Sequence, residues 1–261
     1  MKKFFILKFV LVCISLCISL NARTQTTAYQ TYLDNGVFSA TQAPTGEVRF
    51  PAEFEPVQSV MVVYPLNLPW ELLQEISEDC KLVTVVNKRK TSSTIDEIKN
   101  EYTNNGVNID NCEFIIAKND NLDDGINSHW IRDFGPWCIF NGKNVAIVDN
   151  VYNRSFIDDD SKPISNPSWT NGRWRDDAFA KTYATDNNIP LYGMEVVHTG
   201  GNMMQDGRGV GVSDLIVHTQ SETFAGLSEE TVNQRMEDYL GIDPYHVTID
   251  PQGDYIAHVD C

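Results

Sequence analysis

Trp130 to Trp137 is the first of three short segments whose residue types and spacing could do chemistry. In it, Arg132 and Asp133 precede an aromatic residue and a Gly-Pro pair. That pair would stiffen the chain into a turn and hold the Asp133 carboxylate in one direction. The alternative is purely structural: a local Arg132–Asp133 turn pair packed between two tryptophans.

The other two segments place a histidine beside glycines or an acid. In His198-Thr199-Gly200-Gly201-Asn202, the paired glycines allow two backbones to approach closely, although alone the segment is a tight turn. His258-Val259-Asp260 is predicted to end a strand, in which positions i and i+2 share a face. His258 and Asp260 would then project into one pocket. A surface pair at the chain end is the alternative.

Composition and charge limit the classes of protein to which the chain can belong. The chain has 261 residues, 42% of them hydrophobic and 10% aromatic, which suits one large domain as well as two small ones. With 20 Lys and Arg against 36 Asp and Glu, the formal charge is -16. Phosphate binding needs clustered Lys and Arg, so the balance argues against a nucleic-acid partner. A strong negative charge favours a cationic substrate, and it also serves solubility.

Residues 1–22 are predicted to be a signal peptide. Lys2 and Lys3 precede an apolar stretch that is broken by Lys8 and ends in small or polar residues. The run from Phe9 to Leu20 is too short to span a membrane, and an uncleaved anchor is the alternative. We therefore expect a secreted or periplasmic protein without membrane contact after cleavage.

Strand-like and helix-like stretches alternate from Phe54 onwards, after an N-terminal arm over residues 23–50. The predicted strands are Ser59 to Tyr64, Leu82 to Val86, Cys112 to Ala117, Val145 to Val151, Tyr192 to Val197, Gly211 to His218 and Tyr255 to Asp260. The predicted helices are Trp70 to Asp79, Thr94 to Asn104 with a capping box, Asp176 to Asn187, and Ser228 to Leu240 before Gly241. Asp206-Gly207 is typical of a hairpin turn. This alternation predicts an α/β fold.

The cysteines and acidic runs do not form a metal motif. Four cysteines would remain after signal cleavage, namely Cys80, Cys112, Cys138 and Cys261. Their wide spacing, without a CxxC pair, argues against a zinc site. An oxidising compartment would allow one disulfide among them, and burial as small apolar side chains is the alternative. We expect Asp158-Asp159-Asp160 to be a solvated loop rather than a calcium site.

The order and context of the three segments resemble the Porphyromonas-type peptidylarginine deiminases and the agmatine deiminases. The resemblance covers most of residues 50–261, and it is most specific at Trp130–Trp137, from His198 through Gly209 to Leu215, and at His258–Asp260. It implies a pentein, an α/β propeller of ββαβ blades with pseudo-fivefold symmetry around a central site. The alternating elements fit three or four such blades. Residues 51–261 would thus be an incomplete deiminase domain with the last part of the ring missing.

The resemblance also implies a chemistry, the hydrolysis of a guanidinium to a ureido group and ammonia through a covalent thiouronium intermediate. Asp133 and Asp260 match the carboxylates that accept paired N–H bonds from the guanidinium. His258 matches the general acid and base. Trp130 matches a pocket aromatic, and Arg154 matches an arginine that grips the substrate carboxylate in peptidylarginine members. The implied substrate is peptidylarginine, agmatine or arginine, with no cofactor or metal.

The chain departs from the family pattern at two places. Peptidylarginine members carry a second arginine two residues after the position of Arg154, where this chain has Phe156. The family's nucleophilic cysteine lies beyond residue 261, so no nucleophile is expected in this chain. Cys261 would point to the face of the strand opposite to His258 and Asp260. The alternative function is a catalytically silent secreted remnant that at most binds guanidinium groups.

Overall fold

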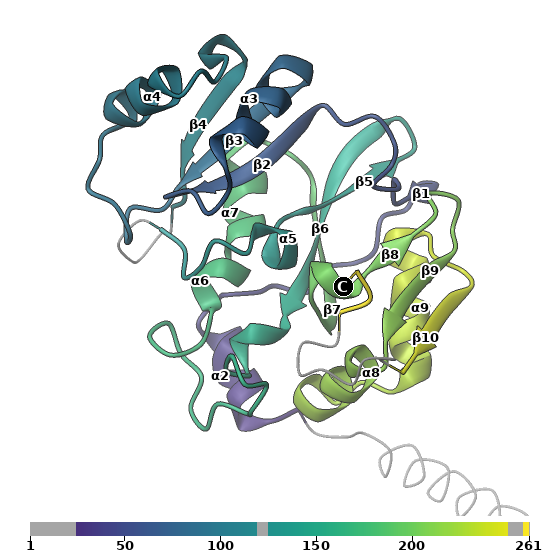
Figure 1. Cartoon of the computed structure of the whole chain (residues 1–261). Coiled ribbons are helices and arrows are strands. Elements are labelled where there is room, and N and C mark those ends of the chain that lie inside the picture. Colours follow the sequence, from purple (N-terminus) through teal and green to yellow (C-terminus); the bar gives the residue numbers. More distant parts are fainter. Residues whose placement is uncertain (1–24, 119–124, 250–257, 261) are drawn as a thin grey trace, which may run out of the picture.

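Three β-sheets with flanking helices make up a mixed α/β architecture (Figure 1). This computed structural model describes residues 25–118, 125–249 and 258–260. The predicted signal peptide, residues 255–257 of the last predicted strand and Cys261 lie outside the described residues.

The first sheet is a parallel β2-β3-β4 unit whose helices cover one face. It contains β2 (Ser59–Tyr64), β3 (Lys81–Val86) and β4 (Cys112–Ile116), joined through α3 (Trp70–Asp79), α4 (Ile95–Asn104) and the short turn η1 (Ile109–Asn111). The predicted capping box starts α4: Thr94 Oγ1 accepts from Glu97 N at 3.2 Å, and the Glu97 carboxylate accepts from Thr94 N at 2.7 Å. These elements match the prediction to within a residue.

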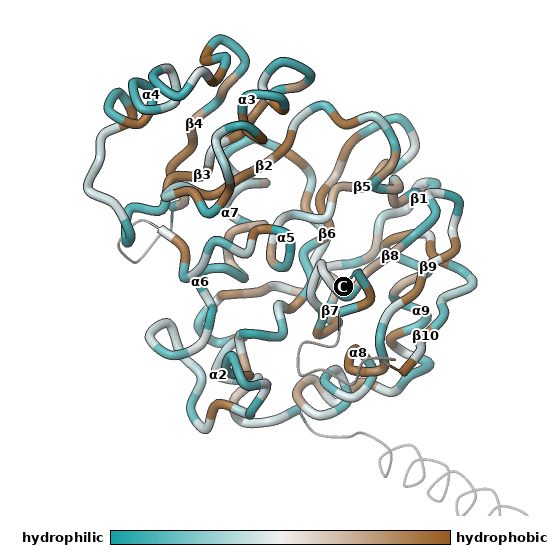
Figure 2. Tube along the Cα trace, viewed as in Figure 1, coloured by the Kyte–Doolittle hydropathy of each residue, from teal (hydrophilic) through white to brown (hydrophobic). Residues whose placement is uncertain are grey.

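Alternate residues of β2 enter two different cores, as the period of a strand requires. Val62 and Tyr64 pack with buried residues of α3 and α4. Val63 lies on the other face, in a cluster with Phe134 and Tyr152. In Figure 2 brown hydrophobic colour runs along β2 and β3, whereas teal and brown alternate around α4. The second face of this sheet therefore supports the segment that carries Asp133.

The second sheet has the order β1-β5-β6-β7. Its strands are β1 (Val48–Arg49), β5 (Trp137–Asn141), β6 (Asn144–Tyr152) and β7 (Leu191–His198). β5 and β6 form an antiparallel hairpin around Gly142, whose φ of +61° favours glycine. β6 and β7 run parallel, and η2 (Asn153–Ser155), α6 (Trp174–Asp177) and α7 (Phe179–Asp186) lie between them in sequence. The last three strands and their helices thus follow the order ββαβ.

The third sheet repeats this order. Its strands are β8 (Met204–Gln205), β9 (Gly211–Asp214) and β10 (Tyr245–Thr248), the first pair antiparallel and the second parallel. α8 (Ile216–Gln220), η4 (Ser221–Ala225) and α9 (Glu229–Leu240) lie between β9 and β10 in sequence. The predicted hairpin is present at Gly207, with φ of +71°. Ser228 and Gly241 cap α9 as predicted.

Three predicted elements differ from the structure. The strand predicted from Gly211 to His218 ends at Asp214, because the Asp214 carboxylate accepts a hydrogen bond from Ile216 N at 2.8 Å and starts α8. The helix predicted from Asp176 begins at Trp174 and divides at Ala178. Residues 258–260, predicted as the end of a strand, form a turn.

The N-terminal segment is part of the core. Within residues 25–50, α2 (Thr27–Asp34) buries Tyr29 and Tyr32 completely. Both rings pack on Phe156, at centroid distances of 5.8 and 5.1 Å. Order therefore begins well before Phe54, where the sequence predicted it to start.

Asp177 of α6 ties this helix to the rest of the fold. Its carboxylate accepts hydrogen bonds from Tyr32 Oη at 2.7 Å, Ser155 Oγ at 2.6 Å and Tyr152 N at 3.1 Å. Burial raises the pKa of Asp177 to about 7. One side chain thus connects α2, η2 and the end of β6.

None of the helices in the described part of the chain has both the length and the apolar character that crossing a bilayer requires.

We expect Asp177 to make stability depend on pH. A carboxyl group whose pKa is higher in the folded state stabilises the fold most below the unfolded pKa of about 3.9. That contribution is lost as pH rises through about 7. Asp177→Asn, which cannot ionise, should therefore weaken the decline in the free energy of unfolding between pH 5 and pH 8, by on the order of 2 kcal/mol. Urea unfolding at both pH values measures this change.

The exposed Asp110→Asn variant is the matched control and should keep the pH profile of the unaltered chain. Burial also raises the pKa of Asp149 and of Asp176, so part of the pH dependence should remain in Asp177→Asn. Identical profiles for Asp177→Asn and the unaltered chain would contradict the prediction.

Candidate functional site

A single helical turn, α5 (Ile131–Phe134), orients Asp133. Asp133 N donates to Trp130 O at 2.9 Å, and Gly135 N closes the turn by donating to Ile131 O at 2.8 Å. Phe134 is buried in the core cluster beneath the turn. The segment is therefore anchored on one side, and the Asp133 carboxylate stays 18% exposed on the other.

His258 lies between the two carboxylates that the sequence singled out. Its Nδ1 atom is 4.0 Å from Asp133 Oδ1 and 3.9 Å from Asp260 Oδ1. The His258 side chain is only 10% exposed, and that of Asp260 is 28% exposed. In Figure 1 the short yellow segment that contains residues 258–260 lies near α5 and β7. The structure thus brings together three predicted site residues from distant parts of the sequence.

Gly200 and Gly201 allow this convergence. A Cβ atom on Gly200 would lie 2.0 Å from Arg132 O, and one on Gly201 would lie 2.3 Å from His258 Nδ1. The Asp133 carboxylate would be 3.0 Å from the same Gly201 Cβ. Gly201 O also accepts a hydrogen bond from Asp260 N at 3.3 Å. The close backbone approach predicted for the glycine pair occurs at the site itself.

Arg132 contacts Asp260 instead of forming a local turn pair with Asp133. Arg132 Nε lies 3.2 Å from Asp260 Oδ2, and the same guanidinium forms an ion pair with Glu53. Oδ2 of Asp260 faces Arg132, and Oδ1 of the same carboxylate faces His258. Arg132 therefore helps to fix the direction of the second carboxylate.

The environment of Asp133 favours a nearby cation. Burial raises the pKa of Asp133, and the charge of Asp260 raises it further. The charges of His258, Arg154 and Arg173 act in the opposite direction without reversing the shift. A positively charged ligand between the carboxylates would relieve this cost of ionisation.

Trp130 lies beside the site and lines a different space. Its side chain is half exposed, and its ring lies 4.3 Å from the ring of His129. Both rings line a pocket of about 430 Å³ with Val63, Pro65 and Lys90. Asp133, His258 and Asp260 are not lining residues of this pocket. The structure therefore does not place Trp130 in contact with the carboxylate pair.

Arg154 is largely buried in η2, where its Nη1 donates to Asp158 O at 2.6 Å. Its positive charge acts to lower the pKa of Asp133. Phe156, at the position where a second arginine was considered, is 1% exposed and stacks on Phe224 at 5.0 Å. The position of Phe156 is therefore part of the hydrophobic core, which accounts for an apolar residue where the family pattern has an arginine.

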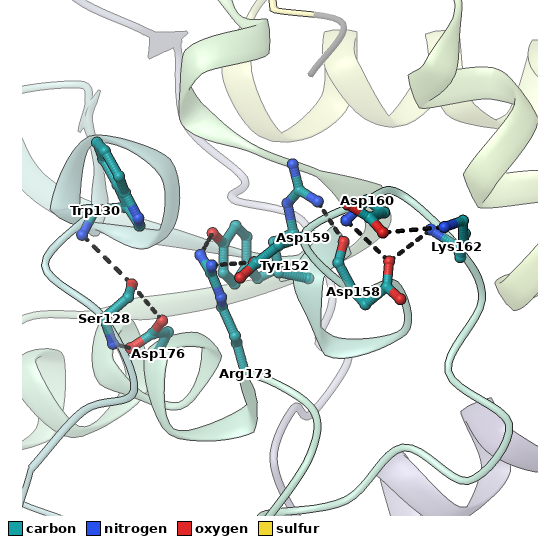
Figure 3. Close-up of polar contacts among 10 residues, drawn as sticks. Ser128, Trp130, Tyr152, Asp158, Asp159, Asp160, Lys162, Arg173 and Asp176 are labelled. Carbon is teal, nitrogen blue, oxygen red and sulfur yellow. Dashed lines mark hydrogen bonds and ion pairs between the residues drawn. The ribbon is translucent and has the colours of Figure 1, made fainter. Parts of the chain in front are cut away.

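A second arginine approaches the same region from another element. Figure 3 shows Arg173 between Tyr152 and Asp159, with a hydrogen bond to the tyrosine hydroxyl at 3.4 Å and an ion pair to the aspartate. Arg173 N also donates to Arg154 O at 3.1 Å. Sequence analysis missed Arg173, because nothing in its local sequence indicates this neighbour. Asp159 itself is exposed, as expected for a solvated loop.

Asp176 anchors the segment that leads into α5. Figure 3 shows its carboxylate at Ser128, whose Oγ and N donate to it at 2.7 and 3.0 Å. Asn127 N donates at 2.7 Å. Burial raises the pKa of Asp176 to about 6. Asp176 therefore holds the chain just before Trp130, as Asp177 holds the chain around Arg154, and neither role was visible in the sequence.

The remaining candidates are structural within the described residues. His198 is buried against Ser213 and Tyr245, and burial lowers its pKa to about 4, so it is neutral. Cys80, Cys112 and Cys138 are free thiols. In the described part of the chain, histidine, cysteine and acidic side chains form no group of three that could hold a metal ion.

Comparison with known proteins identifies the family and similar folds. A model of the Porphyromonas-type peptidyl-arginine deiminase family matches residues 49–260. The chain is similar to the structure of the Enterococcus faecalis agmatine deiminase, with a TM-score of 0.61 and 19% identity over 85% of this chain and 60% of that one. A substrate-bound cysteine-to-serine variant of the C. jejuni agmatine deiminase gives 0.58 and 16%, over 82% and 60%. The chain thus spans about 60% of the length of these structures.

Gly201→Ala should disrupt the site more than the fold. The added methyl group would overlap His258 Nδ1, whose side chain must move away from Asp133. We expect the affinity for an alkylguanidine to fall at least tenfold in a ligand-detected NMR titration, because one carboxylate is then displaced or unpaired.

Gly193→Ala is the matched control. Its Cβ would lie 2.0 Å from Ser39 O, so this position of β7 clashes with a backbone atom instead of a site side chain. This variant should lower the free energy of unfolding and leave the affinity unchanged. Equal affinity losses in both variants would show that Gly201 acts only through general stability.

Proposed function

Because the chain belongs to the Porphyromonas-type peptidyl-arginine deiminase family, we propose that it binds a guanidinium group through Asp133 and Asp260 for conversion to a ureido group. The observation that carries this proposal is the position of His258, within 4.0 Å of both carboxylates. A guanidinium is planar and cationic, and its N–H groups match the paired oxygens of a carboxylate.

The arrangement suits the two steps of a deimination. In the first, a cysteine thiolate attacks the guanidinium carbon, and His258 protonates the nitrogen that leaves as ammonia. In the second, His258 removes a proton from water, the resulting hydroxide attacks the thiouronium carbon, the thiolate leaves, and the proton of the added hydroxyl group passes to solvent. The product is a ureido group. Thiolate, imidazole and carboxylates supply every group that these steps need, so the proposal requires no cofactor.

The proposal assigns the nucleophile to a cysteine outside the described residues. Cys112 lies at the start of β4, where its Sγ donates to Asn108 O at 3.3 Å and burial raises the pKa of its thiol, which disfavours the thiolate. Cys80 follows α3, and Cys138 is exposed on β5. The cysteine-to-serine variant of the C. jejuni agmatine deiminase with bound substrate supports a cysteine in this role.

Peptidylarginine is the substrate that we propose, with agmatine as the second candidate. The charges of Arg154 and Arg173 act on the Asp133 carboxyl group, and the proposal gives these arginines the role of attracting a carboxylate at the other end of an arginine substrate. Trp130 would cover the aliphatic stem from the rim. Secretion or export to the periplasm, inferred from residues 1–22, would give the protein access to peptides.

We further propose that the ββαβ units belong to a pentein propeller. Two of the three sheets have this order, with an antiparallel pair followed by a parallel one. The β2-β3-β4 sheet departs from it, because both of its pairs are parallel. A central site shared by the blades would explain why α5 and residues 258–260 meet.

Asp133→Asn should remove most of the guanidinium affinity. Losing one charged partner of a half-buried ion pair costs about 2 to 5 kcal/mol, which is roughly a thirtyfold to several-thousandfold weaker dissociation constant. Titration of agmatine and of an arginyl peptide, followed by ligand-detected NMR, measures the change. Asp110→Asn, which removes one exposed negative charge, should bind like the unaltered chain. Full affinity in Asp133→Asn would remove Asp133 from the site.

Turnover should depend on the cysteine. A colorimetric assay for ureido product from agmatine and from an arginyl peptide tests this dependence. Multiple turnovers that disappear in Cys261→Ser would assign the nucleophile to Cys261.

A further inference from the structure

The pocket of about 430 Å³ lies at the carboxyl ends of the parallel β2-β3-β4 sheet. Val63 and Pro65 line it from the end of β2, Asn87 and Lys90 from the turn after β3, and residues 127–130 complete the lining. Ligands of α/β proteins commonly bind outside the carboxyl ends of parallel strands, and this volume is within the range of small-molecule sites. We therefore asked which ligand the lining side chains would select.

The two lining asparagines use their amide oxygens within the protein. Asn87 Oδ1 accepts from Arg89 N and from Ile126 N, both at 3.2 Å. Asn127 Oδ1 accepts from Arg175 N at 3.0 Å. In the described part of the chain neither Nδ2 group has a hydrogen-bond acceptor. These two side chains therefore have N–H donors left for a ligand.

Lys90 gives the pocket a positive charge. Its backbone N–H donates to Asn87 O at 2.9 Å, which fixes the root of its exposed side chain in the turn after β3. Among the described residues no acidic side chain forms an ion pair with Lys90, and the pocket lining contains no Asp or Glu. The whole chain carries a formal charge of -16, so a lining with a cation and without an acid differs from the average surface. Its charge and its donors select an anion.

The aromatic part of the lining is fixed by the chain around it. The Trp130 ring is half exposed and lies 4.3 Å from the ring of His129, at an interplanar angle of 38°. Figure 3 shows Ser128 between Trp130 and Asp176: Trp130 N donates to Ser128 Oγ, which donates to the Asp176 carboxylate. A flat apolar group can stack on such an indole ring.

We propose that this pocket binds a small carboxylate with an aromatic body, separately from the guanidinium site. The carboxylate would pair with the Lys90 ammonium group, and the aromatic ring would pack against Trp130 and Val63. One lysine and two amides match a single negative charge, whereas phosphate sites gather several backbone N–H groups or cations. The proposal does not depend on the proposed function.

The test compares an acid with its neutral analogue. 3-Phenylpropanoate and 3-phenylpropanamide have nearly the same shape and differ in charge. In ligand-detected NMR titrations the acid should bind the unaltered chain at least threefold more tightly than the amide. Because the chain is strongly negative, non-specific binding would favour the neutral amide instead.

Lys90→Gln should remove this preference. The variant should bind the acid about three- to tenfold more weakly, because an exposed ammonium group is partly screened by water, and should bind the amide within twofold of the unaltered chain. Trp130→Ala should weaken both ligands to a similar extent, since it removes apolar surface and no charge.

Lys88→Gln is the matched control. Lys88 belongs to the same turn, does not line the pocket and donates to Ser93 O at 2.7 Å. Its substitution removes the same charge from the chain and should leave both affinities within twofold.

Three results would overturn the proposal: no binding of 3-phenylpropanoate, equal affinities for acid and amide in the unaltered chain, or equal losses in Lys88→Gln and Lys90→Gln. The last result would mean that only the net charge of the chain matters. Alkylguanidine binding and its dependence on Asp133 are measured separately, so the proposed function and this inference can each fail alone.

Discussion

The spacing of two carboxylates around one imidazole is the constraint on which the rest of the site depends. Asp133 and Asp260 repel each other, and partial burial strengthens that repulsion because water screens it less. Arg132 contacts Oδ2 of Asp260, and His258 lies between Oδ1 of Asp260 and Oδ1 of Asp133. The absence of a side chain at Gly201 leaves room for the imidazole. The proposed cationic ligand would reduce this repulsion further.

The fold maintains this spacing with aspartates of a different kind. Asp176 and Asp177 are fully enclosed, accept several hydrogen bonds each and have pKa values raised by burial. They fix the backbone before Trp130 and around Arg154. Burial thus divides the acidic residues of this region into supports with satisfied oxygens and a partly exposed pair, Asp133 and Asp260.

Local signals were enough to predict many of the elements and the three site segments. The Thr94 capping box and the Gly241 helix end act within a few residues, so the sequence alone reveals them. α2 was missed because its tyrosines are buried by partners more than a hundred residues away, such as Phe156 and Asp177. The β5–β6 hairpin was also missed, although Asn141-Gly142 is a strong turn signal.

The hydrogen-bond and ion-pair partners of a buried polar group indicate whether the fold depends on that group. Asp177 has three hydrogen-bond donors from separate elements, so the folded state depends on it. The Asp133 carboxylate has only His258 as an ion-pair partner among the described residues, at the long distance of 4.0 Å. Burial raises the pKa of the Asp133 carboxyl group, so its ionised form lowers the stability of the fold without supporting the structure. Residues that cost stability in this way are expected at functional sites. The same physical argument that explains Asp177 as a support therefore gives Asp133 no such role in the fold, which supports the proposal that Asp133 binds a ligand.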